Sequence, residues 1–226
     1  LFLQSMIAHI NNTPGGWRIQ TLEEHHCNVA ILAERFASSF GCRDVARIMG
    51  LLHDKGKEQI AWQNYIQGVT GYNEVYGHVQ KGPHHANIGA GIAQKQYPQI
   101  APLIAQPIAG HHRGLYDYCD YIEVTKGDIP NDVKIGETLP YSLQRFPGME
   151  KYDYHHLVRM LFSCLVDADS LDTELFMTPE QAALRGSKAT MEELLGKLEM
   201  YLQHLRNLSE ETEVNRIRNY VQAQCV

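Results

Sequence analysis

The sequence predicts an all-α domain, and three features of the chain support this fold class. Apolar residues recur at helical spacing in several segments, for example Thr21 to Phe40 and Asp153 to Leu171. Helix boundaries carry capping signals, such as Thr21 and Glu24, which are spaced as a capping box. No segment has a convincing strand pattern, and only 121–125 has the composition of a short strand.

The apolar periodicity and the Gly and Pro positions divide the chain into helices and loops. Loops are expected at 68–83 and at 115–148, and the second is expected to be a long, mostly irregular insert of the kind that is often functional. Helices are expected at 21–40, 44–54, 57–67, 84–96, 101–112, 153–171, 178–207 with a break near Gly186, and 209–224.

Length and domain organisation point to one domain. The chain has 226 residues, which is enough to bury a sizeable core. We expect Leu1 to Ser5, which precede Met6, to be a cloning scar and residues 6–226 to form a single domain. Internal repeats and low-complexity tracts are not found in the sequence.

Composition excludes several classes of protein. Hydrophobic residues make up 44% and charged residues 20%, as in soluble globular proteins, and no apolar run is long enough for a transmembrane helix. A secretory signal is not recognisable either. The five cysteines form no C-x-x-C pair, which favours thiols in a reducing cytoplasm. The net charge of −6 argues against a broad basic face for nucleic acid, although bound metals would add local positive charge.

A His-Asp pair ends one apolar helix, in the run His53-Asp54-Lys55-Gly56-Lys57. An imidazole beside a carboxylate suits Mn, Fe, Co, Ni or Zn better than Ca. A His-Asp dipeptide alone is weak evidence, because a lone His is more often an ordinary surface or core residue. The interpretation as a metal site therefore depends on further ligands elsewhere in the chain.

Histidines in three other segments are candidates for these further ligands. His25 lies at the edge of the apolar stripe of the first helix, where a surface role is the alternative. His85 opens a helix whose small residues let another backbone approach closely. His111 and His112 end an apolar helix, where capping of the C-terminus is the alternative. Each segment alone favours the ordinary role, but together they favour a metal site.

Two aspartates in an otherwise apolar helix strengthen this interpretation. Asp167 and Asp169 lie within 161–171, and a buried carboxylate is costly unless it is paired or bound to metal. Asp167 competes with Asp169 as a ligand, and His26 and His84 compete with their neighbours, although a surface role is expected for His26. Seven candidate side chains exceed the needs of one tetrahedral ion, so two ions are expected.

The ordered set H…HD-x-G-K…H-x-x-x-G-A…HH…AD resembles the HD nuclease domain of the CRISPR-associated type I helicase–nuclease, in the HD metal-dependent phosphohydrolase superfamily. The stretches TLEEHHCNVAILAERFA, LLHDKGK, HHANIGAG, IAGHHRGL and LFSCLVDADSLDTE carry the likeness, which covers about Thr21 to Thr173. The closing stretch Asn215 to Gln224 is similar to the helix that joins this domain to the helicase, so residues 209–226 are expected to be that connecting helix. The chain itself has no G-x-x-x-x-G-K-[ST] loop, so the helicase would be a separate or removed part.

The resemblance implies a role for each candidate. One metal would take His25, His53, Asp54 and Asp169. The other would take Asp54, which bridges the ions, with His85, His111 and His112. Lys57 matches a lysine that points at the site, where it would stabilise the charge of the transition state or align the water.

The activity that follows is hydrolysis of single-stranded DNA by two metals in type I CRISPR interference. The His-rich ligand set predicts Mn, Co, Ni or Fe rather than Mg. The expected partners are single-stranded DNA and a helicase domain or subunit with the CRISPR effector complex, in the cytoplasm and without a membrane. Aromatic and basic side chains beside the motifs are candidates for contacts with bases and phosphates, with packing or a surface role as the alternative: Trp62, Tyr65, Tyr116, Tyr118, Arg113 and Lys81.

Two other functions stay open on the sequence alone. An HD phosphohydrolase that acts on nucleotides or cyclic nucleotides would use the same metal site with a closed pocket for a small molecule. A non-catalytic scaffold that binds a helicase or effector complex would need no stoichiometric metal. Endo- or exonuclease action, cleavage of RNA and the oligomeric state are not predicted.

Overall fold

The structure is a computed structural model that describes residues 5–77, 82–143, 151–186 and 189–224. It confirms the all-α fold class, since helices dominate and the described residues hold only one two-stranded sheet. The elements are β1 (Ile7–Thr13), β2 (Gly16–Thr21), α1 (Leu22–Ala37), η1 (Ser38–Phe40), α2 (Arg43–Leu52), η2 (Lys55–Glu58), α3 (Ile60–Val69), η3 (Glu74–Tyr76), α4 (Ala86–Gln96), α5 (Ala101–Gly110), α6 (Tyr118–Thr125), α7 (Lys151–Met177), α8 (Pro179–Ala183), α9 (Met191–Leu208) and α10 (Glu213–Gln224).

The chain divides into two compact units, Leu1–Ala182 and Ala183–Val226. The predicted metal ligands all belong to the first unit. The second unit contains α9 and α10, and α9 begins with a capping box between Thr190 and Glu193. That residues 6–226 act as one domain, and that 209–226 lead toward a helicase, stays a prediction.

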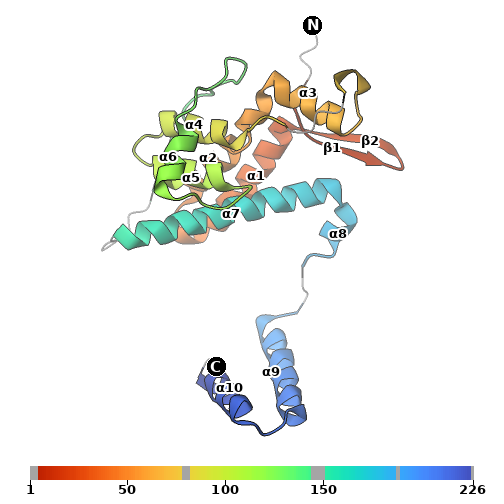
Figure 1. Cartoon of the computed structure of the whole chain (residues 1–226), viewed down its shortest axis with the longest axis vertical. Helices are drawn as coiled ribbons and strands as arrows, with labels where there is room; N and C mark the ends of the chain where they lie inside the picture. Colours follow the sequence, from red (N-terminus) through yellow and green to blue (C-terminus); the bar gives the residue numbers. More distant parts are fainter. Residues whose placement is uncertain (1–4, 78–81, 144–150, 187–188, 225–226) are drawn as a thin grey trace. The chain divides into compact units, whose positions relative to one another are not determined.

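The core of the first unit lies between five helices. Helix α1 packs against α2 and α7, and α5 packs against α4 and α7. Figure 1 shows the long helix α7, in teal, running beside the other helices of this unit. Each of the five contributes at least one fully buried side chain: Val29, Met49, Ile92, Ile104 and Leu161. The metal-site candidates extend from these same helices, so the core fixes their backbones.

The prediction that convincing strands are absent was wrong for the start of the chain. Strands β1 and β2 form an antiparallel hairpin, in which Ile10 pairs with Ile19. A bulge between Ile7 and His9 interrupts the register. It places both Ile7 and Ala8 among the buried residues, so the sequence lacks the strict alternation that signals a strand.

The insert predicted at 115–148 is less irregular than expected, because it contains helix α6. The segment 121–125, which has strand-like composition, is part of this helix and not a strand. The side chain of Asp117 caps the helix by accepting a hydrogen bond from the Asp120 amide at 3.0 Å. Residues 126–143 are irregular but anchored, for example where the Ser142 amide donates to Asp44 at 2.9 Å. Residues 144–148 of the predicted insert lie outside the described part of the chain.

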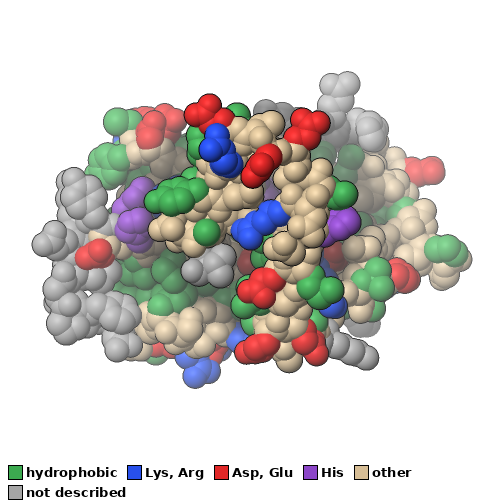
Figure 2. All heavy atoms as spheres, turned by 90° about the horizontal axis from the view of Figure 1, so that it is seen from below, with side chains coloured by type: hydrophobic (Ala, Val, Ile, Leu, Met, Phe, Trp, Pro, Cys, Tyr) green, Lys and Arg blue, Asp and Glu red, His purple; other side chains and the backbone are tan. Residues whose placement is uncertain are grey.

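On the face drawn in Figure 2, acidic and basic side chains are interspersed. Among the described residues, no helix is long and apolar enough to cross a membrane.

Candidate metal centre

The predicted ligands converge because several of them stand at helix ends that face one another. His53 is the C-cap of α2, His85 is the N-cap of α4 and His111 is the C-cap of α5. At a helix end, a side chain can turn toward the helix axis, so adjacent residues such as His53 and Asp54 reach the same site. His25, from α1, and Asp169, from α7, complete the cluster from the sides of their helices.

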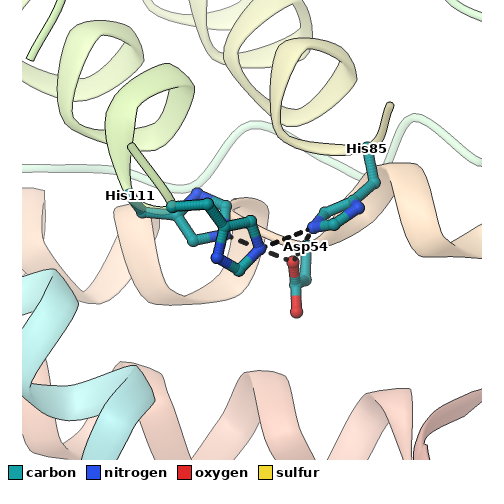
Figure 3. Close-up of side chains that lie close together, drawn as sticks. Asp54, His85 and His111 are labelled. Atoms are coloured by element: carbon teal, nitrogen blue, oxygen red, sulfur yellow. Dashed lines mark hydrogen bonds and ion pairs between the residues drawn. The ribbon is translucent and has the colours of Figure 1, made fainter. Parts of the chain in front are cut away.

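Asp54 lies at the centre of the cluster and is only 1% exposed. Its Oδ2 atom is 3.4 Å from Nε2 of His25 and 3.4 Å from Nε2 of His53. Its Oδ1 atom is 3.2 Å from Nε2 of His85 and 3.5 Å from Nε2 of His111. Figure 3 shows His85 and His111 directed at this carboxylate. The two oxygens of one carboxylate therefore serve two different sets of histidines.

We call these two sets the inner group and the outer group. The inner group is His25, His53 and Asp169, with Oδ2 of Asp54. The Asp169 Oδ1 atom is 3.3 Å from Nε2 of His25 and 3.8 Å from Nε2 of His53. The outer group is His85, His111 and His112, with Oδ1 of Asp54.

The ligand atoms are close enough to share metal ions. The outer group with Asp54 brings one ligand atom from each residue within 4.8 Å of the others, and so do His25, His53 and Asp54. His53, His111 and Asp169 also meet this distance, so the two groups adjoin.

The protonation pattern of the buried histidines suits a metal. His53 donates from Nδ1 to the Gly50 carbonyl oxygen at 2.8 Å, and His111 donates from Nδ1 to the Ile108 carbonyl oxygen at 2.7 Å. These bonds leave the Nε2 lone pairs free. Buried atoms without a hydrogen-bond partner include Nε2 of His25, His53 and His111 and Oδ1 of Asp54. Because unpaired buried polar atoms are costly, this convergence fits a bound cation.

Two glycines let the backbones approach closely enough to assemble the site. A Cβ atom on Gly56 would lie 2.3 Å from the His85 carbonyl oxygen. A Cβ atom on Gly89 would lie 2.2 Å from the Leu52 carbonyl oxygen. The end of α2 and η2 therefore pack directly against the start of α4. This confirms the expectation that the small residues after His85 allow a close approach.

Electrostatics at the centre favour an ionised carboxylate. Burial alone would raise the pKa of Asp54, but Lys57 and the surrounding histidines hold this pKa well below its usual range. The Lys57 ammonium lies 2.6 Å from Oδ2 of Asp54 and is buried. Burial lowers the pKa of His53 to about 3, so its imidazole is neutral near pH 7.

His25 behaves differently in the metal-free protein. Burial opposes its protonation, but the surrounding carboxylates of Asp169, Asp172 and Asp54 raise its pKa to about 10. A proton on Nε2 then occupies the position that a metal ion would take.

Asp172 supports His25 and was not identified from the sequence. The carboxylate is 3% exposed and accepts a hydrogen bond from Nδ1 of His25 at 2.7 Å. It also accepts bonds from the side-chain amides of Gln20 and Asn28, each at 2.8 Å. A carboxylate behind a metal-binding His fixes its tautomer and ring orientation. Its position in the sequence could have indicated this role, because Asp172 follows Asp169 by three residues and therefore lies on the same face of the helix.

The structure separates the competing candidates. Asp169 joins the cluster, whereas Asp167 is exposed. His85 joins the cluster, whereas His84 is exposed. Asp167 and His84 therefore lie outside the cluster around Asp54.

The expected surface role for His26 was wrong. Its side chain is buried, with its ring centroid 5.7 Å from that of His53. His25 nevertheless remains the residue whose Nε2 faces Asp54.

A pocket of about 320 Å³ adjoins the outer group. Its lining includes three of the predicted aromatic residues and the predicted basic residue Arg113. The fourth aromatic residue, Tyr118, is 73% exposed on α6. Lys81 lies outside the described residues. The aromatic residues in the lining are Trp62, Tyr65 and Tyr116.

Comparison with known proteins agrees with this arrangement. The HD domain family matches residues 22–136, just over half of the chain. This span contains every predicted ligand except Asp169. No curated protein gives a significant match to the sequence. HD domain proteins are metal-dependent hydrolases that bind divalent metals, and the His/Asp cluster is suited to such binding. The chain belongs to the HD domain family.

Proposed function

We propose that this protein is a nuclease that hydrolyses phosphodiester bonds of single-stranded DNA with two divalent metal ions. The observation that carries the proposal is the position of Asp54. Its Oδ2 atom faces His25 and His53, while its Oδ1 atom faces His85 and His111. A carboxylate whose two oxygens face separate ligand sets can bridge two ions, an arrangement suited to a two-metal site.

The residues present fit two ions. His25, His53, Asp54 and Asp169 would hold one ion, and Asp54, His85, His111 and His112 would hold the other. When bound, such ions neutralise charge on phosphate oxygens and make water a stronger acid. The excess of imidazole over carboxylate ligands favours Mn, Co, Ni or Fe over Mg.

Lys57 adds a fixed positive charge from the chain itself. Its ammonium is held by Asp54 at 2.6 Å and lies 5.1 Å from the centroid of the Trp62 ring. In this buried position, the charge is screened little by solvent. Lys57 would therefore stabilise the negative charge that develops on a phosphate during hydrolysis.

The biological setting is the less direct part of the proposal. The resemblance of the ordered motif to the CRISPR-associated helicase–nuclease supports a role in type I CRISPR interference in the cytoplasm. A helicase, fused or separate, would deliver the single strand. The net charge of −6 fits a protein that depends on bound metals and a partner, and not on a broad basic face, to hold DNA.

The proposal is tested with two aspartate variants of one helix. Asp169→Asn should reduce cleavage of a single-stranded oligonucleotide with Mn by more than about 100-fold, because losing a charged ligand should cost at least as much as losing a residue behind the ligands. Asp167→Asn is the matched control, because its exposed carboxylate lies two residues away. It should cleave at the wild-type rate, and chelation should stop the wild-type reaction reversibly.

Other outcomes identify the alternatives. Hydrolysis of mononucleotides or cyclic nucleotides, with intact oligonucleotides, would indicate a nucleotide phosphohydrolase. A folded chain that binds no stoichiometric transition metal and cleaves nothing would indicate a scaffold. A folded Asp169→Asn variant that cuts DNA at the wild-type rate would contradict the assignment of the site.

A further inference from the structure

The pocket beside the outer group has features that the metal ions alone do not explain. It shares His85 and His112 with the outer group. Its volume of about 320 Å³ lies at the lower end of the roughly 300–1,000 Å³ typical of small-molecule sites. A group bound there would lie next to a phosphate held at the outer group.

The aromatic walls of the pocket are held in place by their neighbours. Trp62 is only 5% exposed, and its ring lies 6.1 Å from that of His85. Gly82 lies against the Tyr65 ring, since a Cβ atom there would be 2.6 Å from two ring carbons. The Tyr65 ring therefore has its orientation fixed by packing while it still lines the pocket.

Another part of the lining offers a planar cation on an aromatic ring. The Arg113 guanidinium lies 4.7 Å from the centroid of the Tyr116 ring and donates to the Tyr116 hydroxyl at 3.3 Å. Both residues belong to the lining. Arginine and tyrosine planes are surfaces on which nucleobases stack, and the guanidinium also attracts phosphate.

We propose that this pocket holds one unpaired base of the DNA strand, stacked on Tyr65 and Tyr116, next to the phosphodiester that is cleaved. The inference rests on the proposed nuclease function and specifies its substrate. A base in a duplex would have to leave its stack and its partner to enter the pocket, whereas a single strand supplies an unpaired base at little cost. The pocket is thus a physical reason for selection of single strands. Because every base has an aromatic face, cleavage should depend little on sequence.

The test compares two substrates and three tyrosine variants. One substrate is a single-stranded oligonucleotide, and the other has the same length with every base replaced by a tetrahydrofuran abasic spacer. Tyr65→Ala and Tyr116→Ala should raise KM for the normal strand about 5- to 150-fold, as expected for the loss of one stacked base. On the abasic strand, both variants should match the wild type, which also shows that they fold.

Tyr72→Ala is the matched control. Tyr72 is also a half-buried tyrosine, but its ring packs edge-on against Trp17 at a centroid distance of 5.5 Å. The variant should leave KM unchanged on both substrates. The proposed base pocket is overturned if Tyr65→Ala and Tyr116→Ala also leave KM unchanged on the normal strand. It is equally overturned if these variants raise KM by the same factor on both substrates.

A binding measurement separates this inference from the nuclease proposal. An oligonucleotide with a single 2-aminopurine is titrated with the Asp169→Asn variant, and the label is moved along the strand. Stacking should quench the fluorescence of the label at one position. Introducing Tyr65→Ala as a second substitution into the Asp169→Asn variant should abolish the quenching. Loss of quenching in the double variant, which differs from the quenching protein only at Tyr65, supports the pocket. Wild-type protein that cuts neither substrate contradicts the nuclease proposal, while quenching at no position contradicts the pocket alone.

Discussion

The inner and outer groups share Asp54 but differ in burial and support. His25 and His53 of the inner group are 0% exposed, and their Nδ1 atoms are fixed by Asp172 and by the Gly50 carbonyl oxygen. In the outer group, His111 is also buried and fixed through the Ile108 carbonyl oxygen, but His112 is exposed. The side chains of Asp169 in the inner group and His85 in the outer group are each 17% exposed, so His112 makes the difference. One carboxylate thus connects a closed environment with an open one.

This difference indicates a division of roles within the site. Ligands whose orientation is fixed by a second set of residues bind metal more tightly. Ligands beside a pocket can instead accommodate a substrate that arrives and leaves. We therefore expect the inner ion to be retained and the outer ion to exchange more readily with solution.

The largest effect should come from removing one ligand of each group. His25→Ala should weaken the inner ion by more than about 100-fold, the upper end of the effect of residues behind the ligands. His112→Ala should weaken the binding of the outer ion only, and excess Mn should restore the activity of this variant. Equilibrium dialysis with elemental analysis measures both ions. Equal losses of the two ions in both variants would break the distinction between the groups.

A smaller effect is expected from the residue behind His25. Asp172→Asn keeps the size of the side chain but removes its charge, so we expect a 10- to 100-fold loss of affinity for the inner ion. The affinity of the outer ion should stay unchanged, a selectivity that general destabilisation would not produce. Asp167→Asn on the same helix is again the control, and equal weakening of both ions by Asp172→Asn would argue against a positioning role.

The sequence indicated which side chains cluster around Asp54 better than it indicated the residues that support them. His53, Asp54, His85 and Asp169 were identifiable because polar ligand types stood at helix ends or in an apolar helix. Asp172 was missed because its role depends on packing of α7 against α1, which brings it to His25. A single sequence contains no direct record of such contacts.

Local sequence patterns failed where tertiary packing outweighed them. The segment 121–125 contains Tyr, Ile, Val and Thr, which favour strands, yet it is helical because Asp117 caps the turn and Tyr121 packs into the core. His26 stands beside His25 on a helix, where adjacent residues diverge by about 100°, so one was expected to face solvent. Contact with His53 buries it instead.

The smallest expected effect is on the pH dependence of the free energy of unfolding, which should differ between the inner and the outer group. In the metal-free protein, Asp169, Asp172 and Asp54 outweigh burial and raise the pKa of His25 to about 10, so its stabilising contribution is full below about pH 6.5 and declines as pH rises toward 10. Partial desolvation and the neighbouring His111 and His85 instead lower the pKa of His112 to about 4, so its contribution rises with pH only between about 4 and 6.5.

Between pH 7 and 8.5, the free energy of unfolding of the metal-free protein should therefore fall by about 1.4 kcal/mol per pH unit for the His25 proton. Urea unfolding at several pH values measures this slope. His25→Gln should reduce the slope but not abolish it, because His111 also contributes to it. Burial lowers the pKa of His111, but Asp54 outweighs this effect and raises the pKa above its usual value. Saturation with Mn should also flatten the slope, because an ion on Nε2 replaces the proton. If the slope matches the wild type in His112→Ala but is smaller in His25→Gln, the proton belongs to the inner group. If the slope is smaller in His112→Ala and matches the wild type in His25→Gln, the proton belongs to the outer group.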